Sequence, residues 1–206
     1  LHAVDGARFI TRRAFSRELE PTQFDEVTNW FRERAPLRAG TGESFAAAEG
    51  ANLVMVPVES LQNFVIGLEI GGREVTPFLN RWVEEALWFS NVTDQTGQGR
   101  SSDSELATQV SLLPLAGGAA AFRFAANDFT GLAEALAGRG YSTLSAVPYE
   151  GAFWNRNRTH PAYGYRRSLF VDDFEAGQNI GWGLSDRDFL SQAARELGKA
   201  EKPFAA

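Results

Sequence analysis

The chain has 206 residues, of which 44% are hydrophobic, and a formal net charge of −6. This length and apolar content suit one sizeable α/β domain with its own core and argue against a disordered chain. The acidic balance and the lack of a basic run disfavour nucleic acid as a partner. The absence of cysteine excludes disulfides, thiolate metal sites and a cysteine nucleophile, and no apolar run approaches the roughly 20 residues of a membrane-spanning helix.

Residues 1–50 are expected to precede the folded domain. Residues 21–34 carry apolar side chains at helical spacing, with acids early and arginines late, which predicts a helix. Residues 35–50 are rich in Gly, Ala and Pro and read as a linker. His2 is expected to be a surface side chain. We therefore divide the chain into a helical linker, 1–50, and a domain, 51–206, and we expect the chain to be part of a longer protein.

The first core segment is predicted at residues 53–58, which are apolar without alternation. Such a run is typical of a strand buried on both faces of a parallel sheet. Open α/β sheets bind ligands outside the carboxyl ends of their strands, so Glu59, which ends this run, is a candidate site residue. The alternative is a solvated acid at a strand end, and Pro57 argues against a central strand because it lacks a backbone donor.

The remaining elements alternate in a way that is typical of an α/β fold. Helices start at Thr76-Pro77, at the capping-box pair Ser102 and Glu105, at Thr130, and at Ser185. The expected helices cover 77–86, 101–113, 131–140 and 185–197, and the expected strands cover 88–92, 141–147 and the residues from 203 onward.

Ser101 is the first candidate for chemistry. The polar loop before it delivers its hydroxyl to a helix N-terminus, where backbone amides and the helix dipole favour an anion. A hydroxyl in this position can attack a phosphate or sulfate ester when a metal or base activates it, and Glu59 can supply a hard oxygen ligand to such a metal. The alternative is that Ser101 and Ser102 only cap the helix.

The second candidate is the aromatic–basic run Phe153-Trp154-Asn155-Arg156. An arginine beside aromatic rings suits a phosphate group attached to a small polyol, because the guanidinium offers a bidentate fork. The alternative is a packed loop with a surface arginine. His160 is expected to be structural or solvated rather than a metal ligand. The chain lacks a nucleophile elbow, a phosphate-binding P-loop and a zinc-type histidine cluster.

Taken together, six stretches resemble the extracellular catalytic domain of lipoteichoic acid synthase-like enzymes, within the sulfatase and alkaline-phosphatase superfamily. They follow the family's order from about residue 50 to the C-terminus. They are NLVMVPVESLQNFVIG, GREVTPFLNRW, DQTGQGRSSDSE, SLLPLAGG, GYSTLSAVPYEGAFWNR and GWGLSDRDFL. The resemblance implies a sulfatase-like α/β fold with a mixed, mostly parallel sheet flanked by helices and incomplete at the C-terminus, so that 51–206 is the N-terminal portion of the domain.

The resemblance also implies an activity: metal-dependent transfer of glycerol phosphate from a phosphatidylglycerol-type lipid to a polyglycerol phosphate or glycan acceptor, through a covalent phospho-Ser101 intermediate. It implies that Glu59 and Ser101 hold the metal, Mn²⁺ or Mg²⁺, where the better-known members carry Thr in place of Ser101. Arg156 matches the arginine that binds glycerol phosphate, and Phe153 and Trp154 match the aromatics beside it. The implied location is the extracellular face of the cell membrane, reached through segments upstream of this chain.

Two departures from the family pattern limit what the resemblance implies. Val147 and Tyr149 stand where the family has a histidine and an acidic residue or asparagine, so substrate specificity stays open. The family's Asp–His metal pair lies beyond the equivalent of Ala206, so we expect this chain alone to bind metal weakly and to be inactive. The alternatives are a sulfatase-like phosphodiesterase or sulfuric ester hydrolase, and a non-catalytic binding module on the same scaffold.

Overall fold

The computed structural model describes residues 20–38, 42 and 45–206. The chain divides into two compact units, Leu1–Glu49 and Gly50–Ala206. In the first unit, the predicted helix is confirmed as α2 (Pro21–Arg34), followed by the short 3₁₀ helix η1 (Ala35–Arg38). Pro21 occupies the first helical position, where its missing N–H costs nothing. His2 lies outside the described residues.

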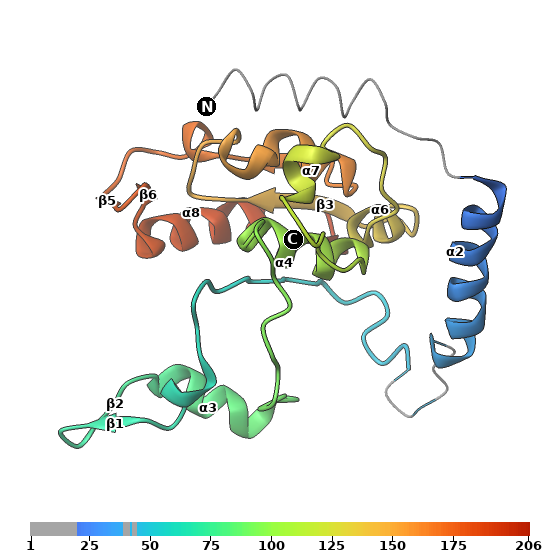
Figure 1. Ribbon diagram of the computed structural model, residues 1–206. Coiled ribbons are helices and arrows are strands. Elements are labelled where there is room, and N and C mark those ends of the chain that lie inside the picture. The colour runs from blue at the N-terminus through green and yellow to red at the C-terminus, as the bar shows by residue number, and fades with distance from the viewer. Residues whose placement is uncertain (1–19, 39–41, 43–44) are drawn as a thin grey trace. The chain divides into compact units, whose positions relative to one another are not determined.

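The second unit is built on a three-stranded parallel sheet of order β4-β3-β7, whose central strand β3 is labelled in Figure 1. Its strands are β3 (Ser142–Ala146), β4 (Arg167–Leu169) and β7 (Phe204–Ala205). Two small antiparallel pairs accompany it: β1 (Glu69–Ile70) with β2 (Arg73–Glu74), and β5 (Asn179–Ile180) with β6 (Gly183–Leu184). The mixed α/β architecture expected from the sequence is therefore confirmed.

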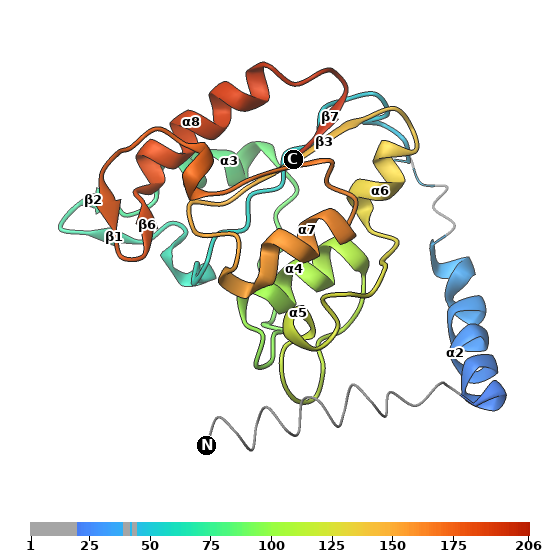
Figure 2. The ribbon, with the colours of Figure 1, turned by 90° about the horizontal axis from the view of Figure 1, so that it is seen from above.

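Helices lie on both sides of the parallel sheet. Figure 2 shows α8 on one side of the strands and α4 and α7 on the other. The helices are α3 (Pro77–Glu85), α4 (Ser101–Val110), α5 (Ala120–Arg123), α6 (Leu132–Ala137), α7 (Arg156–Ala162) and α8 (Asp186–Gly198). The 3₁₀ helices are η2 (Asn63–Val65), η3 (Phe153–Asn155) and η4 (Val171–Asp173). The core packs between α4, α5 and the end of α7, around Leu106, Ala120 and Tyr163.

Local signals placed most of these elements correctly. The helices at α3, α4, α6 and α8 and the strands at β3 and β7 are confirmed. At α8 the Ser185 hydroxyl accepts a hydrogen bond from the Asp188 amide at 3.2 Å, as the capping signal predicted. The predicted cap of α6 was wrong, because Gly131 rather than Thr130 is the residue that precedes the helix.

The prediction that residues 53–58 form a strand buried on both faces was wrong. Leu53 makes a single parallel bridge to Ala205 at the β7 edge, and the side chains of Val54, Val56 and Val58 are 51–59% exposed. Among the described strands this segment pairs with β7 alone, through one bridge, and Pro57 has no amide to donate.

The strand predicted at 88–92 was also wrong. These residues form no regular element, and the side chains of Phe89 and Val92 are exposed. Aromatic and β-branched residues favour a strand only where another strand offers hydrogen-bond partners, and none of the described strands lies beside this segment.

Candidate active site

Ser101 is the first residue of α4 and is half-buried. The residue before it, Arg100, has φ 46° and ψ −120°, a backbone conformation that non-glycine residues rarely adopt. Such a conformation costs about 1–3 kcal/mol and is kept only where the surroundings enforce it. The Ser101 side chain makes no hydrogen bond with any other described residue, so its hydroxyl is available at the helix N-terminus. The structure thus places Ser101 as the sequence predicted.

Asp103 holds the loop that precedes Ser101. Its side chain is fully buried, and its Oδ2 accepts hydrogen bonds from the backbone amides of Gly97 at 2.9 Å and Gly99 at 2.8 Å. A Cβ atom on Gly99 would overlap the Asp103 carboxylate, so only glycine fits there. In the same turn, the Ser102 hydroxyl donates to the Gly99 carbonyl at 2.7 Å. These hydrogen bonds fix the loop and the first turn of α4.

The predicted capping box at α4 was wrong, because Glu105 pairs with distant residues instead. Its Oε1 accepts hydrogen bonds from Nε and Nη2 of Arg156 at 2.8 and 2.6 Å, and its Oε2 lies 3.4 Å from Nε2 of His160. Both partners are charged in the bonds to Arg156, whereas a cap would pair the carboxylate with a neutral amide. Burial opposes ionisation of Glu105, but the hydrogen bonds from His160 and Arg156 outweigh it and hold the carboxyl pKa below its usual value.

His160 is a buried structural histidine rather than a solvated one. Its Nδ1 lies 2.9 Å from Oγ of Ser145 on β3, and that hydroxyl donates to Ser168 on β4 at 2.9 Å. A chain of polar contacts therefore runs from α4 through α7 to two strands of the sheet.

Arg156 is the first residue of α7 and is 95% buried, so the alternative of a surface arginine is excluded. It follows Trp154 and Asn155, which both have positive φ. Its Nη1 is buried and has no hydrogen-bond partner in the described structure. The guanidinium carbon lies 5.8 Å from the centre of the Phe153 ring. One edge of the guanidinium is thus held by Glu105, and Nη1 is left without a partner.

Phe153 and Trp154 belong to an aromatic cluster beside Arg156. The Phe153 ring centre lies 5.6 Å from those of Tyr149 and Trp182, and Trp154 lies 5.5 Å from Phe122. Phe153 is still 37% exposed. The structure therefore brings the predicted aromatics and Arg156 together.

Glu59 is the remaining predicted site residue. It lies in an exposed turn and makes no hydrogen bond or ion pair with another described side chain. Glu59 and Ser101 are both oxygen donors, which suit Mn²⁺ or Mg²⁺. Across residues 20–38, 42 and 45–206, however, no group of three or more His, Asp or Glu side chains is arranged to hold a metal ion. The described residues do not form a metal site by themselves.

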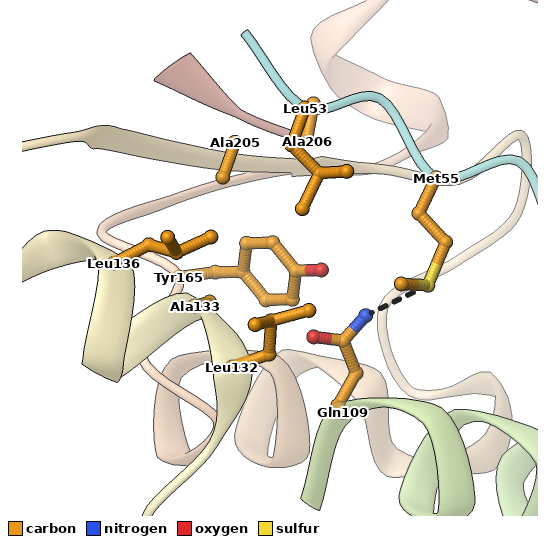
Figure 3. Close-up of a pocket in the computed structure, with 9 residues that line it drawn as sticks. All are labelled: Leu53, Met55, Gln109, Leu132, Ala133, Leu136, Tyr165, Ala205 and Ala206. Atoms are coloured by element: carbon orange, nitrogen blue, oxygen red, sulfur yellow. Dashed lines mark hydrogen bonds between the residues drawn. The ribbon is translucent and has the colours of Figure 1, made fainter. Parts of the chain in front are cut away.

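A small pocket lies between α4, α6 and the β7 edge of the sheet, and residues of several elements line it (Figure 3). Its volume is about 10 Å³, room for at most one water molecule, so it is a packing gap rather than a ligand site. Nε2 of Gln109 donates to the Met55 sulfur across it at 3.3 Å, which ties the segment at the β7 edge to α4. Burial and the charge of Glu105 raise the pKa of Tyr165, beside this pocket, to about 12, so Tyr165 stays protonated at neutral pH.

Sequence reasoning missed Asp103 and the true role of Glu105. One signal was present: Ser101 and Glu105 are four residues apart, as are Arg156 and His160, so each pair shares a helix face. Spacing alone does not reveal that these two faces meet.

A parallel sheet covered by helices on both sides is an arrangement found in the alkaline-phosphatase class of folds, and two solved structures of that class match this chain. The crystal structure of the lipoteichoic acid synthase LtaP from Listeria monocytogenes matches with a TM-score of 0.76 and 22% identity, over 81% of this chain and 42% of that one. A protein of the alkaline phosphatase superfamily from Vibrio parahaemolyticus matches with a TM-score of 0.63 and 26% identity, over 75% and 38%. The chain belongs to the sulfatase family, whose family model matches residues 51–206.

Sequence relatives agree with this assignment. The lipoteichoic acid synthase-like YvgJ of Bacillus subtilis is 35% identical over 95% of this chain, and lipoteichoic acid synthase 2 of the same species is 32% identical over 98%. The resemblance to lipoteichoic acid synthase-like members of the superfamily is therefore confirmed. The chain spans 31% of the length of each of these two relatives. None of the described helices is both long and apolar enough to cross a bilayer.

Proposed function

We propose that this chain is part of a metal-dependent phosphoglycerol transferase that moves glycerol phosphate from a phosphatidylglycerol-type lipid to a polyglycerol phosphate or glycan acceptor. One observation supports this proposal independently of what the relatives are called. Arg156 is hydrogen-bonded to Glu105, and Glu105 lies one helical turn after Ser101 on α4. The guanidinium proposed to bind phosphate and the free hydroxyl are therefore both linked to that helix. Side chains four residues apart on a helix have Cβ atoms about 5–6 Å apart, so the carboxylate that binds Arg156 lies on the same face of α4 as Ser101.

The chemistry is a double displacement at phosphorus. Oγ of Ser101 forms a bond to phosphorus while the bond to the diacylglycerol oxygen breaks, and the leaving oxygen takes up the proton that the hydroxyl loses. An acceptor hydroxyl then forms the new phosphorus–oxygen bond, and Ser101 leaves with a proton. The α4 amides and the arginine oppose the negative charge on the phosphate in both steps.

Substrate recognition is assigned to Arg156, Phe153 and Trp154. Nη1 of Arg156 offers donors to phosphate oxygens, and the rings cover the glycerol carbons. Glu59 and Ser101 supply two oxygen ligands toward Mn²⁺ or Mg²⁺, and we propose that segments beyond Ala206 supply the others. On this proposal the 206 residues alone are inactive, and upstream segments hold the parent protein at the extracellular face of the cell membrane.

Two other functions remain open on specific observations. Val147 and Tyr149, in place of the family's polar pair, favour a sulfatase-like phosphodiesterase or sulfuric ester hydrolase that uses water as acceptor. The lack of a metal cluster among the described residues favours a non-catalytic binding module.

The test is turnover of phosphatidylglycerol vesicles by the full-length protein with Mn²⁺ or Mg²⁺, measured as released diacylglycerol and as extended glycerol-phosphate chains. Replacing a nucleophile removes nearly all catalysis, so Ser101→Ala is expected to lose at least about 10³-fold in kcat. Ser104→Ala, on the same helix, is the control and should retain activity. Turnover by Ser101→Ala at the wild-type rate would refute the phospho-Ser101 intermediate. Release of free glycerol phosphate without chain extension would identify a hydrolase, and loss of all turnover in the wild type would favour the binding module.

A further inference from the structure

We propose that Glu105 is a positioning residue for phosphate recognition: it fixes the guanidinium of Arg156 so that Nη1 remains free for the substrate. This inference rests on the proposed function, because it takes Arg156 to be the group that binds the substrate phosphate. Glu105 itself is not a catalytic residue, since it acts through Arg156.

The geometry of the ion pair decides which part of Arg156 stays free. A guanidinium has five N–H donors, one on Nε and two on each terminal nitrogen. Oε1 of Glu105 accepts from Nε and Nη2 at 2.8 and 2.6 Å, so the carboxylate occupies that edge. Nη1, on the other edge, is buried and has no partner in the described structure. Buried charged donors are rarely left unpaired, so this nitrogen marks the place of a missing acceptor.

Glu105 can fix the arginine because it is itself fixed. Its Oε2 lies 3.4 Å from Nε2 of His160, and the other nitrogen of that ring lies 2.9 Å from Ser145 on β3. The carboxylate is 15% exposed, and hydrogen bonds keep its pKa low enough for it to remain ionised at neutral pH. The side chain is therefore held from α7 and the sheet, in a single orientation.

The same carboxylate relates Arg156 to the nucleophile. Glu105 and Ser101 are one turn apart on α4, whereas Arg156 comes from α7, 51 residues after Glu105. The ion pair links the two helices, so the position of the arginine relative to Ser101 depends on Glu105. Displacing a substrate-positioning group by about 1 Å can cost about 10²-fold in rate, so this link bears directly on catalysis.

The experiment is a double-mutant cycle in the full-length protein. Affinity for glycerol 1-phosphate is measured by calorimetry in a Ser101→Ala background, which cannot turn over, and kcat/KM is measured with Ser101 intact. The variants are Glu105→Gln, Arg156→Ala and the two combined. Glu105→Gln is expected to weaken binding and lower kcat/KM by about 10- to 100-fold. The double variant should be no worse than Arg156→Ala, because Glu105 acts only through the arginine.

Glu196→Gln is the matched control, because Glu196 also pairs with an arginine, Arg167, at 2.7 Å, but at the surface. It should bind and turn over within twofold of the wild type. If Glu105→Gln does not fold, Glu105→Asp keeps the charge and shortens the reach, and it is expected to show the same loss. Normal glycerol 1-phosphate binding by a Glu105 variant, or losses that multiply in the double variant, would overturn the inference. Turnover by Ser101→Ala would instead overturn the proposed function.

Discussion

Removing Glu105 should destabilise the fold far more than removing a surface carboxylate. Glu105→Ala leaves Arg156, whose side chain is 6% exposed, without its counter-charge. Breaking a buried ion pair from one side typically costs about 3–5 kcal/mol in the free energy of unfolding. Each kcal/mol corresponds to about 2–4 °C in a domain of about 150–250 residues and to less in a larger one, so the melting temperature of the full-length protein should fall by several degrees. Thermal unfolding of the full-length protein, followed by circular dichroism, measures this shift.

Two comparisons make this prediction refutable. Glu196→Ala removes a carboxylate whose cationic partners, Arg167 and Lys199, are exposed, and it should cost at most about 1 kcal/mol. Pairing Glu105→Ala with Arg156→Met removes both buried charges and should recover much of the loss, because the desolvated cation is gone. Equal losses for Glu105→Ala and Glu196→Ala, or no recovery in the double variant, would refute the reasoning.

Three further predictions concern the site and the structural elements around it. The pKa of Glu105 is lower in the folded than in the unfolded protein. Its contribution to stability is therefore full above the unfolded pKa, about 4.3, and is lost as the pH falls through the folded pKa. When urea unfolding is followed from pH 7 to 3, Glu105→Gln should lose less stability at acid pH than the wild type. Gly99→Ala should cost about 1–3 kcal/mol and lower activity, because the new Cβ displaces Asp103, whereas Gly117→Ala enters open space and should change unfolding little. Ser185→Ala removes the cap of α8 and should cost about 1 kcal/mol in the same assay.

The helices were predictable because their signals are local. Pro77 and Ser185 mark helix starts through their own backbone and side-chain chemistry, and these marks hold wherever the helix later packs. The strand signal at 53–58 failed because burial is not a local property. An apolar run becomes a buried strand only if other elements cover both of its faces. Here β7 pairs with Leu53 and α4 contacts Met55, but Val54, Val56 and Val58 on the other face stay exposed.

The sequence by itself determined the frame of the candidate site: a helix that begins at Ser101 and an arginine beside two aromatics. It also carried the family resemblance, because short motifs keep their order along the chain. Only the tertiary structure decided what Glu105 does. From the sequence, the nearest partner of that carboxylate is the start of its own helix. In the fold, burial removes water as a competitor, and the charged Arg156, distant in sequence, is the stronger partner. Pairing across the core depends on which faces meet, and that is fixed by packing rather than by spacing.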